Sequence, residues 1–536
     1  MLLRELAQRR WLTGSLCAVA AALLLSSALP AQQRERTPPA AAAAEDKGAD
    51  KEKDKDKEKK PEEKPPKEEK PSVTHHEIRV GAAVIRYTAT AGYMPMKDEA
   101  GKLKANIFFV AYAKDGAPAN RRAVTFAFNG GPGSSSVWLH LGAIGPKRVV
   151  MTDEGQPLPP PYRLVDNEYS WLAFTDLVFI DPVTTGYSRP APGEKPEQFH
   201  GVQEDIESVG EFIRLYATRY ARWASPKFLA GESYGTTRAA GLSGYLQDRY
   251  GMYLNGIVLI SSILNFQTAD FNVGNDLPYI LFLPSYTSTA WYHKRLPADL
   301  QSGPLAKAVA ESEKFASTEY NLALTRGSEL PAAERQAIVK KLARLTGLSE
   351  KFIESNDLRV PLFRFTKELL RDERRTVGRL DSRFQGIDRD AAGERFDFDP
   401  SYAAIYGTYT AMINDYLRTE LKYENDLPYE ILTARVRPWN YGTAQNRYVN
   451  VADTLRGAIS QNRDLKVFVA AGYYDFATPY FAAEYTFNHL GLDSSLYKNI
   501  RLERYESGHM VYIHKPSLVK MTSDIAAFYQ SALPQP

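Results

Sequence analysis

The segment Gly-Glu-Ser-Tyr-Gly at residues 231–235 constrains the fold of this chain more than any other. It has the form G-x-S-x-G, follows an apolar run at residues 228–230 and precedes a helix-like run over residues 236–250. A strand, a sharp turn and a helix in this order lift a serine hydroxyl clear of a sheet. The flanking glycines permit the tight turn and close packing of the helix on the strand. The pattern predicts a nucleophile at Ser233, although the motif alone also fits an ordinary turn.

A glycine-rich loop provides a second signal. The sequence Asn-Gly-Gly-Pro-Gly-Ser-Ser-Ser at residues 129–136 follows a strand-like run at residues 123–128. Such a loop can direct backbone N–H groups at the oxyanion that develops during acyl transfer. The two motifs, each at the end of a strand, indicate a catalytic serine far more strongly than either does alone.

An acid and a histidine follow in the order that a serine hydrolase needs. Asp475 comes after the apolar run 465–471, and His509 comes after the strand-like run 499–505. A serine hydroxyl needs an imidazole to accept its proton, and the imidazole needs a carboxylate to fix its tautomer. Among the eight histidines, His509 has the strand-end setting with small neighbours. Serine, acid, histidine is the chain order of the α/β-hydrolase fold, although Asp475 also fits a turn cap.

Alternating strand and helix patterns predict the α/β class, with a mostly parallel sheet covered on both faces. Strands are expected, after a hairpin at residues 78–87, at residues 107–113, 124–128, 177–181, 227–231, 257–261, 465–471 and 499–505, and helices at residues 204–223, 236–250 and 518–533. Residues 265–437 are instead helical and charged. We expect this region to form a helical cap insertion over the site, between a first hydrolase part at residues 73–264 and a second at residues 438–536.

The N-terminus reads as an export signal followed by a linker. Residues 1–31 combine a basic start, an apolar run and small residues before a cleavage site, which is typical of a signal peptide. The alternative is an uncleaved membrane anchor over residues 11–29, because the run nears spanning length. Residues 32–72 are rich in Ala, Pro, Lys, Glu and Asp, and segments such as 51–57 have no apolar residue to bury, so a disordered linker is expected. It would serve as a tether or as a passive spacer.

Composition excludes several function classes. Hydrophobic residues make up 44% and aromatic residues 12% of the 536 residues, which is enough for a sizeable core, and a net charge of +3 gives no indication of nucleic acid. No metal-binding motif is apparent, and we expect no metal and no cofactor. The single cysteine, Cys17, lies in the N-terminal apolar run, so the expected mature chain has no disulfide. That is compatible with an exported bacterial protein, periplasmic or extracellular. The expected partner is a peptide, with membrane contact only if the signal stays uncleaved.

The motifs together resemble the serine carboxypeptidase family, peptidase family S10. Besides the loop and the elbow, matching pieces are Tyr-Ser-Trp at residues 169–171, Asp-Pro-Val at residues 181–183 and Gly-His-Met-Val at residues 508–511. The resemblance runs from about Gly92 to the C-terminus. It implies an α/β-hydrolase fold and a hydrolase that releases C-terminal residues from peptides.

The resemblance also implies a role for each matching residue. Ser233 corresponds to the nucleophile, Asp475 to the orienting acid and His509 to the base. The backbone N–H groups of Gly131 and Tyr234 correspond to the oxyanion hole.

A pair that binds the C-terminal carboxylate of the substrate is implied at Asn129 and Glu232. An ionised glutamate repels a carboxylate, so Glu232 can help only when protonated, and burial beside an anion raises a carboxyl pKa. The chain departs from the family pattern at Phe128 (usually Trp), at Ser134 (usually Cys) and at Ala143, where a second glutamate usually shares a proton with the elbow glutamate. The missing partner predicts a milder preference for acidic pH.

These observations predict an exported bacterial serine carboxypeptidase-like hydrolase that acts through an acyl-Ser233 intermediate. One alternative keeps the triad but acts as an ester hydrolase or acyltransferase. Another is a non-catalytic envelope-binding protein with a degenerate hydrolase fold. Asn129 and Glu232 favour the carboxypeptidase because they make sense only if a carboxylate is bound, and the intact triad disfavours the non-catalytic protein.

Overall fold

The computed structural model describes residues 69–533. The expected signal peptide over residues 1–31, the alternative anchor over residues 11–29 and Cys17 lie outside the described residues, as does the expected linker up to residue 68. Within the described part of the chain, no helix is both long enough and apolar enough to cross a membrane.

A ten-stranded mixed sheet organises the described chain. Its main path is β1 (Ser72–Val80), β2 (Ala83–Lys97), β3 (Leu103–Lys114), β7 (Thr175–Ile180), β4 (Ala123–Phe128), β9 (Lys227–Glu232), β10 (Gly256–Ile260), β13 (Lys466–Gly472) and β14 (Ile500–Tyr505), and β8 (Arg189–Pro190) pairs with β3. Pairing is antiparallel from β1 to β7 and parallel from β7 to β14. The sheet confirms the predicted mostly parallel α/β class.

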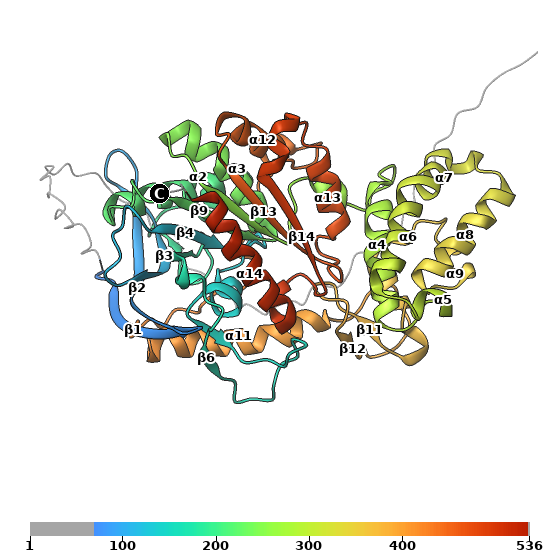
Figure 1. Ribbon diagram of the computed structural model, residues 1–536, viewed down its shortest axis with the longest axis horizontal. Helices are drawn as coiled ribbons and strands as arrows, with labels where there is room; N and C mark the ends of the chain where they lie inside the picture. The colour runs from blue at the N-terminus through green and yellow to red at the C-terminus, as the bar shows by residue number, and fades with distance from the viewer. Residues whose placement is uncertain (1–68, 534–536) are drawn as a thin grey trace, which may run out of the picture. The chain divides into compact units, whose positions relative to one another are not determined.

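Helices cover both faces of this sheet (Figure 1). One face packs against α2 (Val202–Arg219), α3 (Tyr234–Tyr250) and α12 (Ala452–Gln461). The other packs against α14 (Lys515–Ala532) and α11 (Pro400–Thr419). The parallel strands are therefore buried between two helical layers, as their nearly continuous apolar sequences require.

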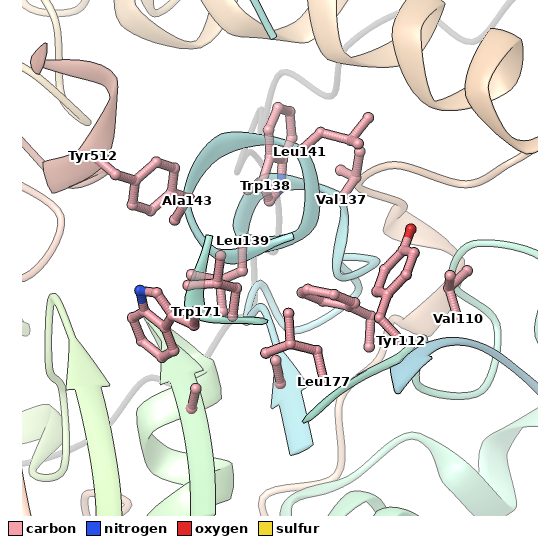
Figure 2. Close-up of a cluster of buried hydrophobic side chains, with 14 of the residues drawn as sticks. Val110, Tyr112, Val137, Trp138, Leu139, Leu141, Ala143, Trp171, Leu177 and Tyr512 are labelled. Atoms are coloured by element: carbon pink, nitrogen blue, oxygen red, sulfur yellow. The ribbon is translucent and has the colours of Figure 1, made fainter. Parts of the chain in front are cut away.

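Alternate residues of the central strands enter two different hydrophobic clusters. Phe228 stacks on Tyr529 of α14, whereas the next residue, Leu229, belongs to the cluster beneath α2 and α3. Successive strand side chains point to opposite faces, so β9 contributes to both cores. Figure 2 shows part of the first cluster, which includes Trp171 and Tyr512.

The inserted region contains a third hydrophobic cluster. Its helices are α4 (Leu277–Tyr292), α5 (Ala298–Gln301), α6 (Leu305–Phe315), α7 (Asn321–Arg326), α8 (Ala332–Thr346), α9 (Glu350–Ser355) and α10 (Leu362–Glu368), with the short strands β11 (Thr376–Val377) and β12 (Gln385–Gly386) after them. In Figure 1 these helices gather beside α13 (Tyr480–Asn488), which α4 contacts. In contrast, α11 packs its apolar face against the cluster over the sheet. Residues 265–437 thus contribute to two cores.

Candidate active site

The serine elbow is strained in the way its motif predicts. Ser233, between β9 and α3, has φ 60° and ψ −130°, a region that non-glycine residues rarely occupy. Its backbone N–H donates to the carbonyl of Ile260 at 3.0 Å, which anchors the turn to β10. A Cβ on Gly231 would lie 2.2 Å from the carbonyl oxygen of Gly235. Glycine is therefore required for the elbow to close.

Asp475 and His509 come from the ends of neighbouring strands, β13 and β14. The His509 Nδ1–H donates to Asp475 Oδ2 at 2.8 Å, and both side chains are buried. The other carboxylate oxygen of Asp475 accepts the backbone N–H groups of Ala477 at 2.7 Å and Thr478 at 3.0 Å. The Thr478 hydroxyl donates to Oδ2 at 2.8 Å. This network fixes the carboxylate and leaves Nε2 of His509 as the nitrogen that can accept a proton.

Opposing influences act on the imidazole of His509. Burial disfavours the imidazolium, but the charge and hydrogen bond of Asp475, together with the charge of Glu232, outweigh it and raise the pKa of His509. The pair is therefore arranged to stabilise the imidazolium that forms when a serine proton is taken.

The glycine-rich loop after β4 lies directly against the elbow. A Cβ on Gly130 would stand 2.4 Å from the backbone nitrogen of Tyr234, so only glycine fits there. Gly131 has φ +105°. Tyr234 is the first residue of α3, and the first N–H groups of a helix have no intrahelical partner. The N–H of Tyr234 is thus available beside the loop, as an oxyanion donor requires.

Backbone contacts hold this loop where the family usually has a cysteine. Ser134 forms an isolated antiparallel bridge with Leu432. The N–H of Ser135 donates to the carbonyl of Ile431 at 3.0 Å, and the N–H of Thr433 donates to that of Gly133 at 2.9 Å. These hydrogen bonds tie the loop to the segment after α11 without a disulfide.

Asn129 and Glu232 lie side by side at the base of the site and are almost fully buried, at 1% and 3% exposure. The Leu139 N–H donates to Oδ1 of Asn129 at 3.0 Å, which leaves the Nδ2 of Asn129 as the donor that faces Glu232. Burial raises the pKa of Glu232 to about 7, against the lowering effects of the charge of His509 and of hydrogen bonding by Tyr512 and Asn129. Glu232 is therefore protonated in mildly acidic solution.

A large cavity joins these groups. Its volume is about 1330 Å³. The residues that line this cavity include Ser233, His509, Asn129, Glu232 and Gly131. Helices and loops of the inserted region form the opposite wall. Within residues 69–533, no group of three or more His, Cys, Asp or Glu side chains is placed to hold a metal ion.

An irregular segment from the inserted region, called the strap below, holds both catalytic loops, and no sequence motif indicated it. The strap is residues 379–382. The N–H of His509 donates to the carbonyl of Leu380 at 2.7 Å, and the N–H of Gly508 donates to Oδ2 of Asp381 at 3.1 Å. On the acid side, the N–H of Phe476 donates to the carbonyl of Arg379 at 3.1 Å. Thr478 is the other supporting residue that sequence reasoning missed.

The fold and the site define a serine hydrolase of the α/β-hydrolase class. The family model described as serine carboxypeptidase (Peptidase_S10) matches residues 82–512. The chain belongs to this family, which confirms the resemblance found in its motifs.

Individual relatives match over shorter stretches. Serine-type carboxypeptidase F of Aspergillus niger is 30% identical over 190 residues, which are 35% of this chain and 30% of that protein. Pheromone-processing carboxypeptidase KEX1 of Arthroderma otae is 38% identical over 140 residues, which are 24% of this chain and 19% of that protein. The matched regions thus span less than a third of these curated relatives.

A solved structure resembles most of the chain in fold. The prohormone-processing carboxypeptidase Kex1 from Saccharomyces cerevisiae superposes with a TM-score of 0.53 at 16% identity, covering 83% of this chain and 91% of that chain. At this identity the likeness supports the fold alone.

Proposed function

We propose that this protein is a serine carboxypeptidase that removes C-terminal residues from peptides through an acyl-Ser233 intermediate. Ser233 Oγ attacks the scissile carbonyl while Nε2 of His509 takes its proton, and Asp475 stabilises the imidazolium. The N–H groups of Gly131 and Tyr234 receive the oxyanion. The imidazolium then protonates the departing amino group, and a water deprotonated by His509 hydrolyses the acyl-enzyme.

The observation that carries the proposal is the buried pair of Asn129 and Glu232 at the base of the cavity. The Nδ2 of Asn129 has no well-aligned hydrogen-bond partner in the described structure, and a Glu232 whose burial raises its pKa to about 7 supplies a second donor in mildly acidic solution. Two such donors complement a carboxylate. An ester hydrolase that binds neutral substrates has no use for them.

The matched test is a peptide with a free C-terminus and the same peptide amidated. We expect the free acid to have the higher kcat/KM, mainly through KM, at pH 5–6. An ester of the same acyl group reports whether the triad is active. Equal rates on acid and amide with good ester turnover would favour the alternative, an ester hydrolase or acyltransferase. Failure of a fluorophosphonate probe to label Ser233 in the folded protein would favour the non-catalytic alternative.

We further propose export, with cleavage after residue 31, and a lid role for the inserted region at residues 265–437. The lining of the cavity by residues from α4 and α10 supports the lid. N-terminal mass analysis of the protein recovered from the periplasm or the medium tests export. A mature chain that retains residues 11–29 would instead support the membrane-anchor alternative.

A further inference from the structure

Three buried polar atoms lie close together beside the catalytic cavity, which Asn129 and Glu232 line, whereas Tyr512 lines a smaller cavity of about 210 Å³. Among the described residues, the Nδ2 of Asn129, the Oε2 of Glu232 and the hydroxyl of Tyr512 have no hydrogen-bond partner of normal geometry. Tyr512 and Asn129 nevertheless act on the pKa of Glu232 as hydrogen-bonding side chains, so the three groups form only poorly aligned hydrogen bonds with one another. Buried polar groups without partners are costly and need an explanation. A ligand bound among them would supply well-aligned partners.

The position of Tyr512 depends on two small residues of η1 (His140–Ile144). A Cβ on Gly142 would lie 2.5 Å from Cε2 of the Tyr512 ring, so the ring occupies space that only glycine leaves open. Figure 2 shows the ring pointing toward the turn that carries Ala143. Ala143 is the position at which the family usually has a second glutamate. The tyrosine that acts on Glu232 thus packs against the turn that carries Ala143.

We propose that the Tyr512 hydroxyl is a third donor for the C-terminal carboxylate of the substrate, in place of the absent glutamate. This inference rests on the proposed function and names a residue that determines its specificity. Asn129, Glu232 and Tyr512 then offer three donors to the two oxygens of one carboxylate.

The chemistry of a phenol differs from that of a carboxyl partner. Burial and the charge of Glu232 raise the pKa of Tyr512, so its hydroxyl remains protonated at every physiological pH. The other groups that face Glu232 are His509 and Asp475, whose charges act on it in opposite directions, and Tyr409 of α11. Unlike a glutamate, Tyr512 cannot ionise and repel the substrate as the pH rises. Part of the carboxylate recognition should therefore persist above pH 7.

The test is Tyr512→Phe, which removes one oxygen atom and keeps the ring against Gly142. A hydrogen bond to a charged group corresponds to about ten- to hundredfold in affinity. At pH 5, where Glu232 is protonated, we expect KM for the free-acid peptide to rise by about that factor. KM for the amidated peptide, ester turnover and kcat should change little.

Tyr409→Phe is the matched control. Tyr409 is also buried, its hydroxyl lies 2.7 Å from the same Cβ position on Gly142, and it lines the same cavity of about 210 Å³ as Tyr512, but it forms no hydrogen bond with Glu232 in the described structure. Its removal should leave KM for the free acid within about twofold.

Two results would overturn the role of Tyr512. The first is that, at pH 5, the ratio of KM for the free-acid peptide to KM for the amidated peptide is the same in Tyr512→Phe as in wild type. The second is tighter binding of the free acid by this variant, confined to high pH. Tyr512 lowers the pKa of Glu232, so that pattern would mean that it acts only through Glu232. A wild-type enzyme that does not distinguish acid from amide would overturn the proposed function and this inference with it.

Discussion

At the scale of single residues, the site contains stored backbone strain. Ser233 holds a φ of 60° that glycine would adopt at little cost. Both Ser233→Ala and Ser233→Gly should abolish peptide turnover apart from a residual rate of about 10³–10⁴ over water. Because only glycine relieves the strain, Ser233→Gly should be the more stable variant, by about 1–2 kcal/mol.

Urea unfolding monitored by circular dichroism measures the difference, and the alanine variant is the control for loss of the hydroxyl. If Ser233→Ala turned over peptide at the wild-type rate, Ser233 would be excluded as the nucleophile. Equal stability of the two variants would show that the elbow is unstrained in solution.

The buried carboxyl of Glu232 makes stability depend on pH. Burial raises its pKa in the folded protein to about 7, above its ordinary value of about 4.5. The folded state therefore binds the proton more tightly, and the stability that this provides is complete below about pH 4.5 and is lost as the pH rises through about 7. Relative to Glu232→Gln, which does not titrate, wild type should lose about 3 kcal/mol over this range.

The measurement is the free energy of unfolding of wild type and Glu232→Gln at intervals from pH 4 to 9. A constant difference would contradict the raised pKa. The same variant has a kinetic consequence. In wild type, kcat/KM for the free-acid peptide should fall relative to that for the amidated peptide above pH 7, and in Glu232→Gln this fall should be smaller. The fall should be milder in wild type than in relatives that have the second glutamate.

Much of the site could be predicted from sequence because its parts are local. The elbow, the loop and the strand-end acid and base each depend on short segments whose small residues and apolar runs are visible in the chain. Their catalytic roles remain to be tested. Tyr512 could not be predicted, because its proximity to Glu232 depends on how closely two distant segments pack at Gly142.

At the scale of elements, the strap at residues 379–382 connects the inserted region to the catalytic loops. Asp381 is 1% exposed, accepts the N–H of Gly508 at 3.1 Å and pairs with Arg383 at 2.7 Å. Asp381→Asn removes the negative charge that accepts the Gly508 N–H and keeps a side chain of nearly the same size. We expect kcat to fall by about tenfold or more, for free-acid and amidated peptides alike, with KM little changed.

Asp388→Asn is the control for this prediction. Asp388 forms a buried ion pair with Lys367 in the same inserted region and makes no contact with the strap in the described structure. It should lower stability and leave kcat unchanged. If both variants lower kcat equally, the strap has no specific role in positioning His509.

The arrangement of elements was only partly predictable. The parallel strands follow from their apolar runs, and the helices from their periodicity. The sequence predicts that residues 265–437 are mainly helical, but not where α11 lies within them or which core it faces, because an apolar stripe fits either cluster. Its contacts are with the sheet side, through residues such as Tyr409 and Tyr416.

At the scale of the whole molecule, the first described strand marks where a shortened chain can begin. The Ser72 hydroxyl donates to the carbonyl of Leu421 at 2.7 Å, and Pro71 packs against Gly92. A chain that starts at residue 69 keeps both contacts. It should unfold at the same temperature as the longer chain and retain its kcat/KM.

A chain that starts at residue 81 is the informative comparison. It lacks β1 and the buried side chain of Ile78, so it exposes the edge of β2 and should unfold at lower temperature. Thermal unfolding measures the loss of stability. Labelling of Ser233 by a fluorophosphonate probe measures the fraction of active enzyme. Loss of activity in the folded 69–536 chain would show that the preceding residues do more than link.

The strap also sets a rule for recombining this protein with its relatives. Hydrogen bonds join residues 379–382 to the backbone on both sides of the reaction centre, at Phe476 and at His509. A chimera that imports a foreign insert between β10 and β13 would keep this correspondence only if the strap backbone followed the same path and an acceptor remained at Asp381. Crossovers that move the insert together with residues 474–510 would preserve it. Where relatives have exchanged the insert in evolution, the strap and residues 474–510 should therefore have changed together.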